Sequence, residues 1–170
     1  MTLSAQWATL IGAILGLLIS PLSTYMIQHK QEKRDRRGLA AGLLGEIDAL
    51  LLVAVNRNWV AGFKNDIQKL SQQNATKFQQ HISVSQDYFK IYSTNGMKIG
   101  TLGEEVACKV ALAYNLAMSV IEDFRTIQKP FETAGEQKAY YEEMVTIFEL
   151  TIEKGKEAKQ SLEKYLKEGV

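Results

Sequence analysis

The chain has 170 residues, of which 46% are hydrophobic and 23% are charged, and its formal net charge is +1. Such a balanced charge excludes a nucleic-acid platform, which needs a strongly basic face. The single cysteine, Cys108, excludes an internal disulfide, and we expect it to be a reduced thiol buried in a core.

The segment from Ala5 to Ile27 contains no charged side chain. As a helix it would measure roughly 35 Å, which is enough to cross a hydrocarbon core of about 30 Å. Trp7 and Tyr25 fall near its two ends, and aromatic side chains favour the membrane interfaces. We therefore predict a transmembrane anchor over residues 1–29, with a kink at Pro21.

A basic segment, residues 30–37, follows the predicted anchor. Its five positive and two negative side chains give it a charge of +3, and the positive ones are Lys30, Lys33, Arg34, Arg36 and Arg37. The positive-inside rule places the C-terminal part in the cytoplasm and the N-terminus outside, in a single-pass arrangement. We expect the same basic side chains to face membrane lipid. A cleaved signal peptide is the alternative, but residues 1–6 lack the positive charge that such peptides carry.

Small residues recur every four positions in the predicted anchor. They are Ala8, Gly12, Gly16, Ser20 and Thr24. This spacing places them on one ridge of the helix, and Gly12 with Gly16 forms a GxxxG pair that lets two helices approach closely. We predict that the chain forms a homo-oligomer through this ridge.

Residues 38–170 have the length of one compact domain. Subtracting the +3 of the basic segment from the whole-chain charge leaves −2 for this part. Its first apolar positions follow a helical period and are Ala40, Leu43, Leu44, Ile47, Leu50, Leu51 and Ala54. Gly38, Gly42 and Gly45 lower the helix propensity here, and close packing against another helix would compensate for them.

The next segments are shorter. Apolar positions at Trp59, Phe63, Ile67 and Leu70 continue the helical period, either on the same helix or after a break near residues 56–58. Residues 71–85 are polar and predict a surface connection. Residues 88–92 predict a short helix that Ser85 caps and that the Asn95-Gly96 turn ends.

Two long helices follow, each opened by a capping box: Thr101 with Glu104, and Thr133 with Glu136. Both helices show apolar positions that alternate three and four residues apart. The first set is Val106, Val110, Ala113, Ala117, Val120, Phe124 and Ile127; the second is Tyr141, Met144, Phe148, Thr151, Gly155, Ala158, Leu162 and Tyr165. With Pro130 ending the first helix, the pattern predicts a long antiparallel C-terminal hairpin within an all-α, four-helix type of bundle.

The sequence offers little material for catalysis. The two histidines, His29 and His81, lie far apart in the sequence, and neighbouring carboxylates such as Glu142 and Glu143 diverge by about 100° on a helix. We therefore predict no catalytic residues, no metal site and no cofactor.

One segment resembles a known pattern. Residues 92–102 read Tyr-Ser-Thr-Asn-Gly-Met-Lys-Ile-Gly-Thr-Leu and lead into a long helix that contains Tyr114. This arrangement resembles small uncharacterised bacterial proteins that carry an N-terminal membrane helix and a Tyr-x-x-Asn-x-x-x-Ile-Gly-x-Leu-like segment. The resemblance implies a bacterial inner-membrane setting and brings no activity with it. We take Tyr92, Asn95 and Gly100 as candidate residues of a partner site.

These features favour a membrane-tethered, self-associating helical scaffold or regulatory module that binds a protein partner. The alternative is a membrane-acting effector, such as a phage-exclusion or defence protein that works by oligomerising in the membrane. Against it, the predicted anchor has no polar face that would line a wet pore. An enzyme that binds its substrate in the bundle core is a third hypothesis, which the absence of a catalytic constellation disfavours.

Overall fold

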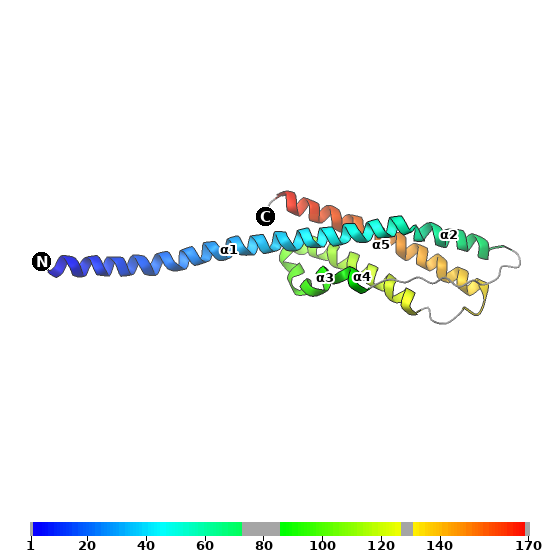
Figure 1. Ribbon diagram of the computed structural model, residues 1–170, viewed down its shortest axis with the longest axis horizontal. Helices are drawn as coiled ribbons and strands as arrows, with labels where there is room; N and C mark the ends of the chain where they lie inside the picture. The colour runs from blue at the N-terminus through cyan, green and yellow to red at the C-terminus, as the bar shows by residue number, and fades with distance from the viewer. Residues whose placement is uncertain (1, 73–85, 127–130, 169–170) are drawn as a thin grey trace. The chain divides into compact units, whose positions relative to one another are not determined.

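The computed structural model describes residues 2–72, 86–126 and 131–168, with side chains for 24–72, 88–124 and 131–168. These residues contain helices and no strand. The helices are α1 (Thr2–Arg57), α2 (Trp59–Leu70), α3 (Lys90–Asn95), α4 (Glu104–Thr126) and α5 (Ala134–Glu168), with short 3-10 helices η1 (Gln86–Phe89) and η2 (Gly96–Leu102) (Figure 1). The prediction of an all-α chain that begins with a long apolar helix is confirmed.

The chain divides into two compact units, residues 1–38 and 39–170. Helix α1 is long and apolar enough to cross a membrane, judged by length and composition. It continues through Pro21, so the proline does not end the helix, and the kink stays a prediction. Among the described side chains, the apolar stretch lies between Thr24 and Leu70.

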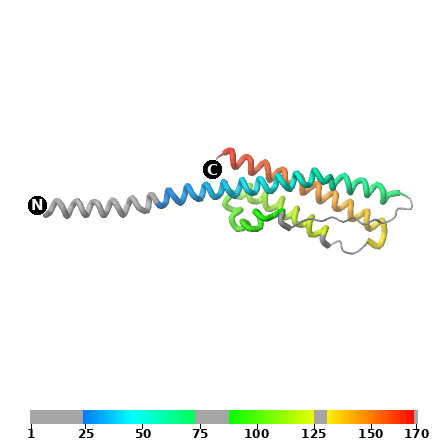
Figure 2. Tube along the Cα trace, in the orientation of Figure 1, coloured from blue at the N-terminus to red at the C-terminus, as the bar shows by residue number. Residues whose placement is uncertain are grey.

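Of the two alternatives that the sequence left open, one continuous helix or a break near residues 56–58, the structure shows the break. Asn58 adopts a left-handed conformation, with φ 51° and ψ 35°, between the end of α1 and the start of α2. Asparagine tolerates this conformation better than most residues that carry a Cβ atom. One residue therefore separates the two helices, which run on in the same general direction (Figure 2).

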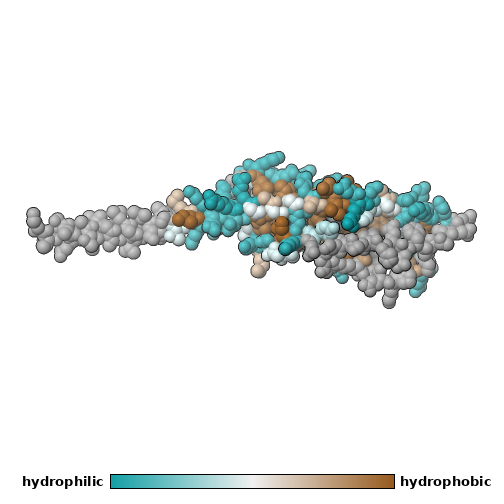
Figure 3. All heavy atoms as spheres, viewed as in Figure 1, coloured by the Kyte–Doolittle hydropathy of each residue, from teal (hydrophilic) through white to brown (hydrophobic). Residues whose placement is uncertain are grey.

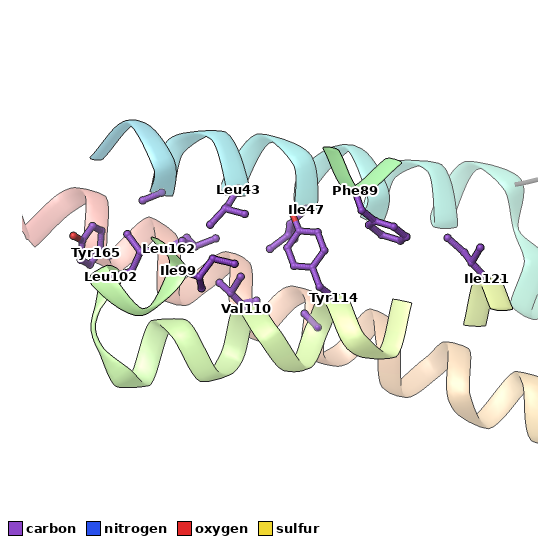
Figure 4. Close-up of a cluster of buried hydrophobic side chains, with 13 residues drawn as sticks. Leu43, Ile47, Phe89, Ile99, Leu102, Val110, Tyr114, Ile121, Leu162 and Tyr165 are labelled. Atoms are coloured by element: carbon purple, nitrogen blue, oxygen red, sulfur yellow. The ribbon is translucent and has the colours of Figure 1, made fainter. Parts of the chain in front are cut away.

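The first core of residues 39–170 joins α1, α4, α5 and the η1–η2 region. Its buried members are Ala40, Leu43, Ile47, Phe89, Ile99, Leu102, Val110, Ala113, Tyr114, Ile121, Ala158, Leu162 and Tyr165. Figure 4 shows Leu43 and Ile47 pointing from α1 toward Val110 and Tyr114 of α4. Fully burying a leucine or isoleucine side chain stabilises a fold by about 1.5–3 kcal/mol, so this inner face of α1 holds the unit together.

The second core joins α2, α4 and α5 and is rich in aromatic side chains. Its buried members are Phe63, Leu70, Val120, Phe124, Tyr141, Met144, Val145 and Phe148. The rings of Phe63 and Tyr141 lie 5.1 Å apart between centroids and are tilted by 56°. Tilted contacts of this kind suit the charge distribution of aromatic rings.

The apolar positions predicted for the two long helices lie on their inner faces. In α4, Val110, Ala113, Val120 and Phe124 are buried, and Ile127 falls outside the described residues. In α5, every predicted position is buried except Thr151, which is half-buried. The periods of three and four residues therefore identified the faces that α4 and α5 turn inward.

An apolar cavity of about 90 Å³ lies where the two cores meet. Its wall includes small residues on three helices: Ala54 of α1, Ala113 and Ala117 of α4, and Gly155 of α5. The cavity is not fully enclosed and opens in part toward solvent. The centre of the unit is thus less well filled than its two ends.

The two predicted capping boxes have different outcomes. The N–H of Glu136 donates to the Thr133 hydroxyl at 3.0 Å, so Thr133 caps α5 as predicted. The Glu136 carboxylate reaches back to the N–H of Glu132 rather than to that of Thr133. The Thr101 prediction is wrong, because Thr101 lies within η2 and its hydroxyl donates to the carbonyl of Lys98 at 2.7 Å.

The glycines of α1 differ in what they meet. A Cβ atom at Gly42 would lie 3.4 Å from the side chain of Ile91, which is the close helix packing that we predicted. Gly38 and Gly45 face open space, with no described atom within 4 Å of a Cβ atom placed there. Close packing within the described chain therefore accounts for the glycine at position 42, but not for those at positions 38 and 45.

Candidate functional site

The Glu46 carboxylate connects three elements of the unit. Oε1 accepts the N–H of Ile91 at 2.8 Å, and Oε2 accepts the N–H of Tyr92 at 3.1 Å. Oε2 also accepts the hydroxyl of Tyr114 at 2.6 Å. One side chain of α1 thereby fixes the start of α3 and the middle of α4 relative to each other.

Helix α3 needs this carboxylate because it is short. It has six residues, and the first N–H groups of any helix have no partner within the helix. The residue before α3, Phe89, offers no side-chain cap. A carboxylate at the helix N-terminus satisfies two of these N–H groups and also suits the helix dipole. Ser85, which we predicted as the cap, lies outside the described residues.

Tyr114 is the donor that completes the arrangement. Its side chain is buried, and burial together with the hydrogen bond to Glu46 raises its pKa well above the usual value. The hydroxyl therefore keeps its proton and donates a hydrogen bond to the carboxylate. The ring of Tyr92 stacks on that of Tyr114 with 4.1 Å between centroids, and the ring of Phe89 meets Tyr114 edge-on at 5.8 Å.

The three residues predicted as a partner site have different surroundings. Tyr92 is half-buried and holds α3 onto α4 through its stacked ring. The Asn95 side chain donates to the carbonyl of Ile91 at 2.9 Å, which closes the last turn of α3. Gly100 is exposed, and its carbonyl accepts the N–H of Gly103 at 3.3 Å. Of the three, Gly100 is the residue that lies at the surface.

Helix η2 presents a different set of side chains to solvent. Ile99 and Leu102 are buried and hold η2 to the first core. Met97 is fully exposed, and Lys98 beside it is exposed too. We call the exposed residues Met97, Lys98 and Gly100 the η2 surface. The η2 surface places the apolar side chain of Met97 beside the positive side chain of Lys98. The opposite side of η2 is held in the first core by Ile99 and Leu102.

Sequence reasoning missed Glu46, on which this arrangement depends. Its partners lie at least 45 positions further along the chain, so no local spacing reveals them. The sequence does contain one indication that Glu46 has a structural role: Glu46 and Asp48 are the only charged residues between Gly38 and Asn56. A charge three positions after a core leucine, Leu43, lies near the buried face of a helix and needs a partner.

The comparisons with known proteins add no relative. No family model, no curated protein and no solved structure matches the chain.

The predicted membrane residues are only partly described. Ala8, Gly12, Gly16 and Ser20 belong to the helical backbone of α1, while their side chains lie outside the described residues. The basic segment is also helical: Lys30, Lys33, Arg34 and Arg37 are exposed and Arg36 is half-buried. Arg36 forms an ion pair with Glu32, one turn earlier, at 3.7 Å.

The described residues show no group of three or more His, Cys, Asp or Glu side chains arranged to hold a metal ion. His29 stacks on Tyr25 within α1, at 6.2 Å between ring centroids. Cys108 is exposed, so the prediction of a buried thiol is wrong. Position 108 is about 200° around the helix from Val106, which places it on the side of α4 that faces away from the core.

Proposed function

We propose that the chain is a membrane-tethered, self-associating helical scaffold or regulatory module. In this proposal α1 anchors it in the bacterial inner membrane as a single pass, with the N-terminus outside. Residues 38–170 form a cytoplasmic helical bundle with an antiparallel α4–α5 hairpin, which recruits or modulates a protein partner. The observation that carries the proposal is the combination of one long apolar helix with a unit that has its own two cores.

The η2 surface supports the partner-binding part of the proposal. Binding sites are often loops held by a rigid scaffold, because the scaffold removes the entropy cost of ordering the loop. Glu46, Tyr114, Ile99 and Leu102 supply that support here. An exposed methionine adapts to many apolar partners, and the adjacent lysine favours an acidic one.

Features of α1 support the self-association part. The GxxxG ridge in the predicted anchor allows close helix contact in lipid. Further along α1, the exposed glycine at position 45 costs about 1 kcal/mol relative to alanine and meets nothing within the described chain. Leu52 and Val55 are also exposed on α1, and Figure 3 shows apolar patches on one face of the molecule. Contact with a second copy would cover such residues.

Self-association is tested by disulfide-free chemical crosslinking of the full-length protein in membranes. Gly12→Ile and Gly16→Ile should reduce the crosslinked dimer at least fivefold, because a branched side chain separates the two helices. Ala13→Ile is the matched control, since it adds a similar side chain off the ridge. Equal crosslinking in all three variants would exclude the ridge as the interface.

Partner binding is tested by pull-down of the full-length protein from membranes in mild detergent. Met97→Asp and Lys98→Glu should remove a specific partner without changing helicity, because both side chains are exposed. Leu150→Asp is the control, an exposed apolar position on α5. If all variants retain the same partners, the η2 surface is not the binding site.

The membrane-acting effector makes a different prediction. Induced expression of an effector would depolarise the membrane, which a potential-sensitive dye reports within minutes. A scaffold leaves the membrane potential unchanged. Depolarisation that Gly12→Ile abolishes would replace the scaffold with the effector.

A further inference from the structure

We propose that Met97 is a reversible oxidation site, at which a hydroperoxide converts the thioether into a sulfoxide and thereby weakens binding by the η2 surface. The oxidation depends only on the described chain and on the oxidant. Its effect on binding rests on the proposed function, in which the η2 surface binds a protein partner.

Met97 is the most exposed of the described methionines. Its exposed fraction is 102%, compared with 54% for Met26, 37% for Met118 and 1% for Met144. Met26 belongs to the predicted anchor, where lipid would cover it. Because an oxidant must reach the sulfur atom, we expect Met97 to react first.

The residues around Met97 leave its sulfur uncovered. Gly96 precedes it, and Gly100 lies three positions later in η2. Side chains three positions apart eclipse one another in a 3-10 helix, so position 100 is the one whose side chain would stand beside Met97. A Cβ atom at either glycine would meet no described atom within 4 Å, chain neighbours aside. The sulfur is therefore open because both adjacent positions lack a side chain.

The fold keeps Met97 at the surface. Ile99 and Leu102 already occupy the inward side of η2 and are buried in the first core. The Thr101 hydroxyl donates to the carbonyl of Lys98 at 2.7 Å, which closes the turn that carries Met97. The methionine therefore has no inward position to which it could move without displacing a core side chain.

The reaction transfers one oxygen atom to the sulfur. A lone pair of the sulfur attacks the nearer oxygen of the hydroperoxide, so that the S–O bond forms while the O–O bond breaks. The sulfur loses two electrons, and the hydroperoxide is reduced to water or to an alcohol. The proton of the transferred oxygen moves to the leaving oxygen, and solvent water relays it at an exposed site.

The product changes the chemistry of the η2 surface. A sulfoxide is polar, so it disrupts contacts that an apolar methionine makes. The charge of Lys98 is unaffected, and the apolar half of the surface is lost. Thiol-dependent reductases return the sulfoxide to the thioether, with two thiols oxidised to a disulfide and one water released.

The oxidation is tested on the full-length protein in lipid nanodiscs with dilute hydrogen peroxide. Peptide mass spectrometry follows each methionine over time. Met97 should be oxidised at least tenfold faster than Met144 and at least threefold faster than Met118. These ratios are measured within one folded protein and need no variant.

Two glycine variants test why Met97 is open. Gly100→Leu should slow the oxidation of Met97 at least threefold, because the new side chain stands beside the sulfur. Gly62→Leu is the matched control, since it adds the same side chain to α2 at a position where a Cβ atom also meets no described atom within 4 Å. Circular dichroism confirms that both variants keep their helices.

The effect on binding is measured by pull-down, and the probe is the protein that the intact chain captures and Met97→Asp does not. Oxidised full-length protein should capture at least fivefold less of it. Met97→Leu keeps an apolar side chain without a sulfur, so it should bind both before and after peroxide. Met118→Leu is the control and should remain sensitive to peroxide.

Two results would overturn the proposal. One is oxidation of Met97 that is no faster than that of Met118. The other is full capture of the probe after Met97 has been converted completely to the sulfoxide. If Met97→Asp removes no protein from the pull-down, partner binding by the η2 surface is wrong and the regulatory half of the proposal falls with it, while the oxidation rates still decide the chemical half.

Discussion

Tyr114 and Tyr140 both carry a buried hydroxyl oxygen, and they differ in what that oxygen meets. The Tyr114 hydroxyl donates to the Glu46 carboxylate, whereas the Tyr140 oxygen has no hydrogen-bond partner among the described residues. Burial raises the pKa of both side chains above the ordinary tyrosine value, so both stay neutral at physiological pH. We therefore expect the Tyr114 hydroxyl to stabilise the fold and the Tyr140 hydroxyl to destabilise it.

Replacing each tyrosine by phenylalanine tests this contrast. Tyr114→Phe removes a hydrogen bond to a charged group and should lower the free energy of unfolding by about 2 kcal/mol. Tyr140→Phe removes an unsatisfied buried hydroxyl and should leave the stability unchanged or raise it by about 1 kcal/mol. Urea unfolding of the full-length protein, followed by Trp59 fluorescence in the Trp7→Phe background, measures both. Similar losses in the two variants would contradict the assigned role of Glu46.

Cys108 gives a second prediction at this scale. Because its side chain is exposed on α4, a maleimide should label the native protein completely without denaturant. Cys108→Ser is the blank, and it should retain the stability of the parent protein within about 0.5 kcal/mol, as expected for a surface substitution. Labelling that requires urea would mean that the thiol is covered.

The sequence predicts burial well where an apolar spacing repeats over many residues. It predicts burial poorly where a single residue is assigned without such a repeat. Val110 and Phe124 follow from a repeated spacing, so one atypical neighbour does not change their assignment. Cys108 was assigned to the core from its residue type and its place beside the apolar positions of α4, although its angular position on α4 points away from Val106. The helical angle, which was available from the sequence, was the better guide.

Among the elements, α3 depends most on a distant residue. Helices of fewer than about 12 residues are marginal by themselves, and α3 has six. Its first N–H groups bind Glu46, and its side chains Ile91 and Tyr92 pack on Gly42 and Tyr114. The element therefore exists because α1 and α4 hold it from two sides.

Glu46→Ala should release α3 while leaving the long helices folded. Three donors lose their acceptor, so the unit should lose about 3 kcal/mol or more of stability. Hydrogen–deuterium exchange of residues 90–95 should become at least tenfold faster. Asp48→Ala is the control: Asp48 makes an exposed ion pair with Lys159, which contributes little. Unchanged exchange in Glu46→Ala would show that packing alone holds α3.

The outcome of the two capping boxes shows where local patterns stop being sufficient. Thr133 precedes its helix by one position, and the expected hydrogen bond forms. Thr101 has the same pattern, but η2 extends through Leu102 and Gly103 adopts φ 90° before α4 begins. The tertiary contacts of Ile99 and Leu102 stabilise η2 and thereby displace the predicted cap. No sequence spacing contains that information.

For the whole molecule, both cores lie within residues 39–170. We therefore expect a fragment of these residues to fold without lipid and to show the helical circular dichroism of the intact unit. Thermal unfolding should be cooperative. Gel filtration beside the full-length protein then separates association through the anchor from association through this unit. An unfolded fragment would mean that residues 1–38 contribute to its stability.

The all-α class and the long apolar first helix were predictable because both follow from composition and period. The Glu46 arrangement and the cavity were not, because each depends on which helix faces which. Glu46 meets a residue 68 positions away, and the cavity is lined jointly by residues of α1, α2, α4 and α5. Such contacts between residues that are distant in the sequence form only when the unit is folded.

Glu46 also bears on how the chain is synthesised. It lies in a second apolar stretch of α1, and it leaves the ribosome well before Tyr114. A charged side chain near the middle of such a stretch opposes insertion by about 2.5–3.5 kcal/mol, and Asp48 adds to this. We expect that Glu46→Leu with Asp48→Leu sends this stretch into the bilayer as a second span. A C-terminal topology reporter would then change sides, whereas an unchanged reporter would show that the two carboxylates are not needed to keep the stretch out of the membrane.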